Sequence, residues 1–188
     1  MYIFQRRIVF NKSGHPGTPK DYNLENTEEV YIKTEDNLKL LSWYHKGNNS
    51  LPLLVYFHGN SFHIGDRAYR IQKYIEKNWS VLLVSWRGFG GNEGNPTEKN
   101  LYKDAEAVLK WIKNNTEFKF KELVIYGESL GSGAAVEMGT KYEFLSIVLE
   151  APFTSINDIA KIRYKIFPTK YLVKDKFDNF SKIDKITS

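Results

Sequence analysis

The chain has 188 residues, of which 41% are hydrophobic and 26% are charged, with no cysteine and a formal net charge of +5. This length suffices for one domain with a hydrophobic core, and the composition is that of an ordinary globular protein. Without cysteine, a disulfide framework, a thiol nucleophile and a cysteine-ligated metal are excluded. Lysine and arginine are spread along the sequence, so the charge indicates a solvated basic surface, and we expect no nucleic-acid partner.

The sequence carries no recognisable targeting segment. No apolar run approaches the roughly 18 residues of a membrane-spanning helix. Residues 1–7 are too short for the apolar region of a signal peptide, and their charges stand on the wrong side of it. As written, the chain is therefore expected to be cytoplasmic.

The first third of the chain predicts a lead-in followed by a hairpin. Residues 1–27 are expected to be irregular, because the stretch 11–27 is rich in Gly, Pro, Asn and Lys. Apolar and polar residues then alternate over 30–33, and the mostly apolar residues 38–44 predict the return strand. The turn signal Glu35-Asp36-Asn37 separates them, which predicts an antiparallel hairpin.

Beyond the hairpin, short apolar runs alternate with helical stripes. Unbroken apolar runs are typical of parallel strands buried on both faces. Strand–helix–strand alternation predicts an α/β fold with a mostly parallel, doubly wound sheet, whose ligands bind at the carboxyl ends of the strands. Thr97 is the expected N-cap of the second helix. The apolar runs are 53–57, 81–84, 123–126 and 147–149, and the stripes are Ile71/Tyr74/Ile75, Leu101/Ala105/Val108/Ile112 and Ala134/Ala135/Met138.

Ser129 is the candidate nucleophile. It stands in Gly127-Glu128-Ser129-Leu130-Gly131, which matches the G-x-S-x-G pattern, after an apolar strand and before a small-residue helix. A sharp strand-to-helix turn exposes a serine hydroxyl above the sheet, and the flanking glycines let strand and helix approach closely. The free backbone N–H of Leu130 at the helix start can bind an oxyanion. The alternative is an ordinary turn with a serine near a helix start.

A second loop predicts the other oxyanion donor. His58-Gly59-Asn60 follows the first parallel strand, where α/β-hydrolases place this donor. Asn60 is the expected N–H.

Taken together, these segments resemble the α/β-hydrolase superfamily, most closely its small, often membrane-anchored serine hydrolases of the protein-depalmitoylase type. The segments occur in the family's order across nearly the whole chain. They are Gln5-Arg6-Arg7, Tyr56–Asn60, Trp86–Gly90, Asn92–Glu98, Tyr126–Gly131 and Leu149–Ile156.

The resemblance implies hydrolysis of an ester or thioester through an acyl-enzyme. Ser129 would attack the carbonyl of a small acyl ester or acylated substrate, while Leu130 and Asn60 would hold the oxyanion. A histidine oriented by a carboxylate would act as base and then acid. No spacing of His, Asp and Glu resembles a metal site, and we expect no cofactor.

The histidine and its acid are not evident in this sequence. In this fold they follow the serine along the chain, but all four histidines, His15, His45, His58 and His63, precede Ser129. His58 ends the strand expected beside the one that leads to Ser129 and is the alternative base, with His63 in the loop beyond a weaker one. His58 is instead expected to pack beneath the oxyanion loop, and His15 and His45 to lie on the surface. Among the carboxylates, Glu150 is expected to order its loop, Glu128 to point away from the serine, and Asp66 to begin a helix. Asp175, Asp178 and Asp184 are expected to be solvated.

Both ends are expected to be shortened relative to the family pattern. The sequence stops at Lys185–Ser188, where a seventh strand would begin, so we expect a single incomplete domain over 1–188 that lacks the last two strands. Residues 156–188 would form part of a cap or linker. If a membrane anchor normally precedes Gln5-Arg6-Arg7, the whole protein would be membrane-associated.

Several functions remain open at this point. The chain is a serine hydrolase impaired by the missing acid and histidine, a non-catalytic remnant or binding module, or one half of a split hydrolase. An exposed strand edge would favour association, including association with a complementing C-terminal fragment. A basic nucleic-acid binder is the least supported alternative.

Overall fold

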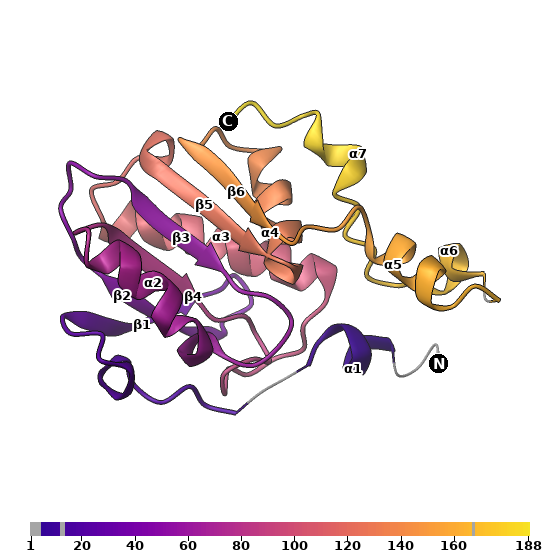
Figure 1. Ribbon diagram of the computed structural model, residues 1–188, viewed down its shortest axis with the longest axis horizontal. Coiled ribbons are helices and arrows are strands. Elements are labelled where there is room, and N and C mark those ends of the chain that lie inside the picture. Colours follow the sequence, from indigo (N-terminus) through magenta and orange to yellow (C-terminus); the bar gives the residue numbers. More distant parts are fainter. Residues whose placement is uncertain (1–4, 12–13, 167) are drawn as a thin grey trace.

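A computed structural model describes residues 5–11, 14–166 and 168–188. Parts of the predicted lead-in, residues 1–4 and 12–13, lie outside the described residues. Six strands form one sheet in the order β1-β2-β4-β3-β5-β6, with helices on both faces (Figure 1). The strands are β1 (Thr27–Lys33), β2 (Lys39–His45), β3 (Leu53–Phe57), β4 (Ser80–Val84), β5 (Leu123–Glu128) and β6 (Ser146–Glu150).

Three helices cover the sheet: α2 (Ala68–Ile75), α3 (Glu98–Asn115) and α4 (Leu130–Gly139). Thr97 caps α3 as expected, because its side chain accepts a hydrogen bond from the backbone N–H of Asn100. The other described helices are α1 (Gln5–Val9), α5 (Ile156–Arg163), α6 (Thr169–Leu172), α7 (Phe180–Ile183) and the 3-10 helices Pro19–Tyr22, Ile64–Arg67 and Phe120–Glu122.

The predicted pairing of strands is confirmed. β1 and β2 form the antiparallel hairpin, and β2 joins the sheet through an antiparallel pairing with β4. The pairs β3–β4, β3–β5 and β5–β6 are all parallel. Their carboxyl ends therefore lie at one edge of the sheet.

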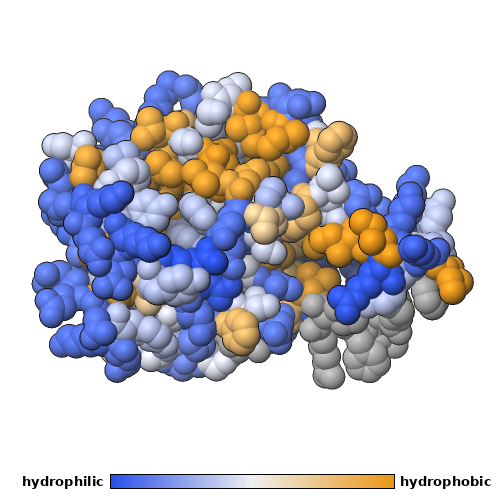
Figure 2. All heavy atoms as spheres, in the orientation of Figure 1, coloured by the Kyte–Doolittle hydropathy of each residue, from blue (hydrophilic) through white to orange (hydrophobic). Residues whose placement is uncertain are grey.

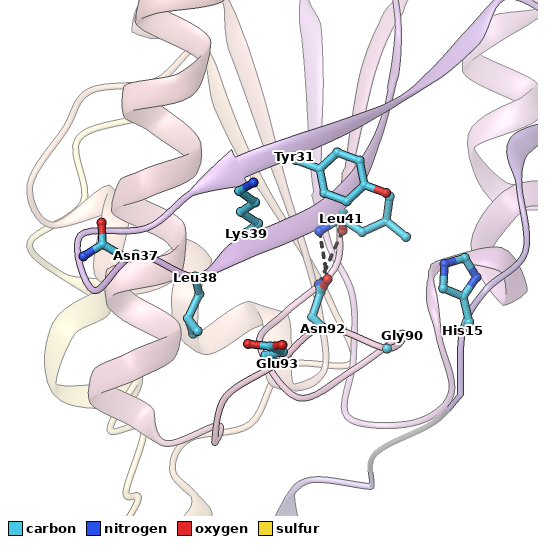
Figure 3. A pocket seen from close by; sticks show the side chains of 10 residues that line it. His15, Tyr31, Asn37, Leu38, Lys39, Leu41, Gly90, Asn92 and Glu93 are labelled. Carbon is cyan, nitrogen blue, oxygen red and sulfur yellow. Dashed lines mark hydrogen bonds between the residues drawn. The ribbon is translucent and has the colours of Figure 1, made fainter.

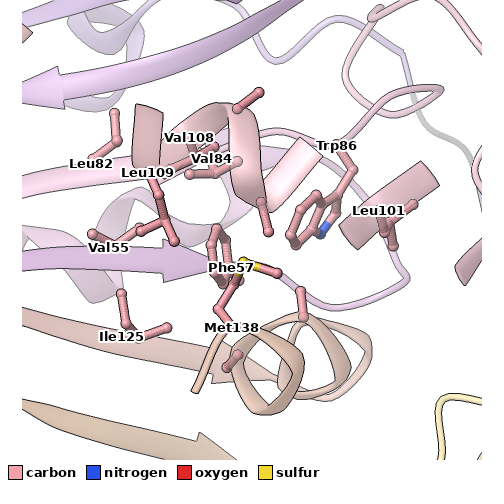
Figure 4. Packing of buried hydrophobic residues seen from close by; sticks show 14 of the residues in the cluster. Val55, Phe57, Leu82, Val84, Trp86, Leu101, Val108, Leu109, Ile125 and Met138 are labelled. Atoms are coloured by element: carbon pink, nitrogen blue, oxygen red, sulfur yellow. The ribbon is translucent and has the colours of Figure 1, made fainter. Parts of the chain in front are cut away.

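The core consists of two layers because successive side chains of a strand point to opposite faces. Leu53, Val55 and Phe57 of β3 pack with α3 and α4, whereas Leu54 and Tyr56 pack on the side of α2. Figure 4 shows the first layer, where strand side chains such as Val55 and Phe57 meet helical side chains. All five residues of β3 are buried, as are all five of β4.

The expectation of burial on both faces is wrong for β6. Its five residues are partly exposed, and Val148 keeps 39% of its surface accessible. Among the described strands β6 pairs only with β5, so it lies at an edge of the sheet. Its apolar run encodes a strand, but the run alone does not decide how much of that strand is covered.

Three other expectations need correction. The lead-in is not irregular throughout, since it contains α1 and the 3-10 helix Pro19–Tyr22. His45 is buried rather than on the surface, and its Nδ1 lies 3.2 Å from the Thr27 hydroxyl across the hairpin. Asp175 is buried, not solvated: it pairs with the Arg6 guanidinium at 2.8 Å. Arg6 lies 169 positions earlier in the chain, so local sequence cannot indicate this contact.

The chain after α6 contacts the body of the domain through Phe177. Phe177 is fully buried and contacts the rings of Phe10, Tyr102 and Phe153. Its ring also fills the space beside Gly133 of α4. No helix in the described part of the chain is long and apolar enough to cross a membrane.

Candidate active site

The strand register brings the two predicted loops together. Phe57 at the end of β3 pairs with Gly127 of the neighbouring β5. Asn60 follows three residues after the first of these, and Ser129 two residues after the second. Both leave the sheet at its carboxyl edge, where ligands bind in such folds.

Ser129 occupies a strained turn between β5 and α4. Its backbone has φ 47° and ψ −110°, a region that residues with a side chain rarely adopt. The turn is held by three hydrogen bonds: the Ser129 N–H donates to the Glu150 carbonyl at 2.9 Å, and its own carbonyl accepts from the N–H and the hydroxyl of Ser132. The serine itself is partly exposed.

The two glycines of the motif are required by close packing. A Cβ on Gly131 would collide with the carbonyl of Phe57. A Cβ on Gly127 would lie 2.7 Å from the Cα of Ser132 and 2.8 Å from the Cβ of Ala135. The helix can therefore approach the ends of β3 and β5 only because both positions lack a side chain.

Two backbone N–H groups are free near the serine. Leu130 is the first residue of α4, so its N–H has no partner inside the helix. The N–H of Asn60 has no hydrogen-bond partner in the described part of the chain. Asn60 is nevertheless fixed, because its side chain donates to the Val9 carbonyl at 3.1 Å and its carbonyl accepts from the N–H of Asn11 at 3.1 Å.

Ser129, Leu130 and Asn60 line one cavity of about 210 Å³. Most of its other walls are apolar and come from segments far apart in the sequence. The sequence does not predict these walls, because no pattern in the short helix α5 indicates that it lies opposite Ser129. The remaining lining residues are Val9, Phe153, Ile156, Ile159, Ala160, Arg163 and Tyr164.

Glu128 is held away from the cavity by Arg67. The Arg67 Nε and Nη2 atoms donate to the two carboxylate oxygens of Glu128 at 3.0 and 2.7 Å. The Tyr56 hydroxyl also donates to this carboxylate at 3.0 Å. Burial alone would raise the pKa of Glu128, but the bonds from Arg67 outweigh it and lower that pKa below its usual 4.5.

Glu150, at the end of the neighbouring strand β6, forms an ion pair similar to that of Glu128. Its carboxylate pairs with Arg70 at 2.5 Å and accepts from the Tyr126 hydroxyl at 2.8 Å. The hydrogen bond from Arg70 lowers the pKa of Glu150. Glu150 is thus tied to α2, in line with the loop-ordering role expected for it.

None of the four histidines lines the cavity of Ser129. His58 is fully buried between the rings of Trp86 and Phe89, and its Nδ1 lies 2.6 Å from the Gly59 carbonyl. Burial, and then the charge of Arg67, lower its pKa to about 4, so it is neutral at pH 7. His63 lies 2.9 Å from Asp66, which accepts from the His63 N–H at the start of the 3-10 helix Ile64–Arg67.

A larger hollow of about 400 Å³ lies elsewhere, between the hairpin and the loop after β4 (Figure 3). Its lining includes His15, Tyr31 and Lys39, but not Ser129. Asn92 forms part of its wall and accepts from the Leu41 N–H at 2.8 Å, so this side chain is used to join the loop to β2. The hollow therefore belongs to a different part of the molecule from the proposed chemistry.

The loop after β4 is fixed by a buried arginine. Arg87 is only 2% exposed and donates to both carboxylate oxygens of Asp104 on α3. It also pairs with Asp36 in the hairpin turn at 2.7 Å. The sequence places Arg87 in a family segment but does not indicate either partner. No group of three or more potential metal ligands occurs among the described residues.

In this mostly parallel sheet, β5 leads directly into a strained serine, and two loops beside it present free N–H groups. This arrangement defines an α/β-hydrolase type of site. The family model described as serine aminopeptidase S33 matches residues 49–185. An uncharacterized protein of Mycobacterium tuberculosis is 30% identical over 190 residues, which cover 97% of this chain and 66% of that protein. Protein bem46 of Schizosaccharomyces pombe is 29% identical over 171 residues, which cover 85% of this chain and 57% of that protein.

Among solved structures, an esterase of Pyrococcus furiosus superposes with a TM-score of 0.69 and 26% identity, covering 86% of this chain and 65% of that one. The chain belongs to the α/β-hydrolase superfamily, in the family of the serine aminopeptidase S33 model. It spans between 57% and 66% of the length of these three proteins.

Proposed function

We propose that the chain carries the nucleophile half of a serine hydrolase that cleaves carboxylic esters or thioesters through an acyl-enzyme on Ser129. The observation that carries this proposal is the cavity shared by Ser129, Leu130 and Asn60. The serine hydroxyl would attack the carbonyl carbon. The developing oxyanion would accept from the N–H groups of Leu130 and Asn60, whose strength as donors rises in a site shielded from water.

The cavity walls support an acyl substrate. Ile156, Ile159 and Phe153 present apolar surface beside Ser129, which suits the hydrocarbon part of an acyl group. Arg163 lies on the same lining and supplies a positive charge.

Turnover requires a base, and the described residues bring no histidine into the cavity of Ser129. The four histidines lie elsewhere, and His58 is too weakly basic to serve. We therefore expect the isolated chain to hydrolyse short acyl esters poorly, with a residual rate from oxyanion stabilisation and binding. In the whole protein, a histidine and a carboxylate from another segment or a complementing fragment would complete the site.

Labelling with a fluorophosphonate probe tests the proposal. We expect mass spectrometry to find the probe on Ser129, faster than on other serines, and the label to disappear in Ser129→Ala. Ser181→Ala is the control, since Ser181 is an exposed serine on α7 that does not line the cavity of Ser129. The absence of label on Ser129, alone and with the remaining segment of a relative added, would instead favour a non-catalytic binding module.

A further inference from the structure

One buried side chain joins the oxyanion loop (residues 58–62) to the nucleophile elbow, which is the turn Gly127–Gly131 that carries Ser129. Arg67 is 7% exposed and lies at the end of the 3-10 helix that precedes α2. Its Nη1 donates to the Ser61 carbonyl at 2.7 Å, next to Asn60. Its Nε and Nη2 donate to Glu128, the residue before Ser129. A single guanidinium therefore spans the two loops that supply the oxyanion donors.

The geometry of this contact makes it rigid. A guanidinium presents its donors in a planar fork that matches a carboxylate at two points, so the pair resists rotation as well as separation. The Tyr56 hydroxyl holds Glu128 from the side of β3. Since Glu128 stays ionised, all of these bonds keep their charge-assisted strength at neutral pH.

The two loops also touch directly at Gly59. A Cβ at this position would lie 3.0 Å from the Glu128 Oε1 and 3.4 Å from the Ser129 Cβ. The oxyanion loop thus rests against the elbow with little free space. A shift of Glu128 would change the position of the loop relative to Ser129.

The neighbouring ion pair of Arg70, three residues further along in α2, provides a comparison. Arg70 pairs with Glu150, and Tyr126 stacks on Tyr56 with ring centroids 4.6 Å apart. The charges and partners of this pair resemble those of Arg67 with Glu128. However, the hydrogen bonds of Arg70 go to Glu150 and Tyr69, and none goes to the oxyanion loop.

We propose that Arg67 is a positioning residue that sets the distance between the Asn60 N–H and Ser129, with Glu128 as its anchor. This inference rests on the proposed function, because it assigns the N–H an oxyanion to bind. Arg67 itself touches no reacting atom. Its charge and its fork act through the Ser61 carbonyl and Glu128.

Amide hydrogen exchange on the full chain tests the structural half of this proposal. We expect Arg67→Met to raise at least tenfold, at pH 7, the exchange rate of amides that the oxyanion loop protects, above all the Asn11 N–H, which donates to the Asn60 carbonyl. The matched variant Arg70→Met should leave these amides at the wild-type rate, although it also removes a partly buried ion pair. Equal protection of the loop in both variants would overturn the proposal, whether or not the protein reacts with any probe.

The kinetics of fluorophosphonate inactivation test the chemical half. Arg67→Met should lower the maximal inactivation rate about tenfold or more, because small misplacements of a stabilising group are costly, while the half-saturating probe concentration stays unchanged. Arg67→Lys keeps the charge without the fork, so it should restore the rate only in part, and it serves if Arg67→Met does not fold. A wild-type rate in both variants would refute the role of Arg67. If wild-type Ser129 is not labelled at all, the proposed function fails, and the exchange experiment still decides whether Arg67 positions the loop.

Discussion

At the scale of one residue, burial gives His58 a structural role, although histidine is a common catalytic side chain. It directly follows a central strand, yet its ring is fully buried between Trp86 and Phe89. Its Nε2 has no hydrogen-bond partner there. A charged imidazolium in this place would lose its hydration and face the positive charge of Arg67. The residue is therefore held in its neutral form and packs as part of the core beneath the oxyanion loop.

This burial predicts a pH dependence of stability. The folded pKa of His58, about 4, lies below its usual 6.5, so the unfolded chain binds a proton more readily. The stabilising contribution is complete above pH 6.5 and is lost as the pH falls toward 4, at about 1.4 kcal/mol per unit and roughly 3 kcal/mol in all. Urea unfolding at pH 7 and pH 4.5 should show this loss in the wild type, and His58→Gln should lack that component. Parallel pH profiles for the two proteins would contradict the expectation.

At the scale of elements, Asp175 connects three segments that are distant in sequence. Its carboxylate accepts from the Glu98 N–H at 2.9 Å, at the start of α3, and pairs with Arg6 on α1. In return, the Glu98 side chain accepts from the Lys176 N–H at 2.7 Å. A carboxylate at a helix N-terminus satisfies a free N–H and interacts favourably with the helix dipole. Asp175 therefore fixes residues 173–176 and α1 against the body of the domain.

Removal of this carboxylate should loosen that arrangement. We expect Asp175→Ala to lower the free energy of unfolding by about 1–3 kcal/mol, since it leaves the partly buried Glu98 N–H without its acceptor. Limited proteolysis should then cut first in residues 156–176. The control is Asp184→Ala, whose carboxylate is exposed and should change stability by less than about 0.5 kcal/mol. Equal effects of the two substitutions would show that Asp175 does not have this role.

At the scale of the whole molecule, the sheet is covered unevenly. The strands β3 and β4 are enclosed by helices on both faces, whereas β6 lies at the edge. Figure 2 shows an apolar area over the region where β5 and β6 lie in Figure 1. Leu145, directly before β6, and Val148 within it are exposed, at 52% and 39%. An edge strand with exposed apolar side chains favours pairing with another chain.

We therefore propose that β6 mediates association of the chain. Sedimentation velocity should show concentration-dependent self-association, and Val148→Lys should weaken it at least tenfold, because a charge at a strand edge opposes pairing. Ile162→Lys is the matched control, since Ile162 is 74% exposed on α5, away from this edge. Unchanged association in Val148→Lys would exclude β6 as the contact.

The sequence by itself determined the features that depend on residues close together along the chain. The hairpin, the parallel strands, the N-cap at Thr97 and the turn at Ser129 follow from local periodicity, capping and the small size of glycine. The position of Asn60 beside Ser129 also follows, once the strands β3 and β5 are taken as neighbours.

Only the tertiary structure decided the remaining features, because each depends on contacts between distant segments. The partners of Asp175 and Arg67, the burial of His45 and the exposure of β6 are set by which elements pack together. The cavity beside Ser129 is likewise closed by Val9 and α5, more than a hundred residues apart. A sequence pattern indicates that a side chain is polar or apolar, but only the packed chain determines what that side chain meets.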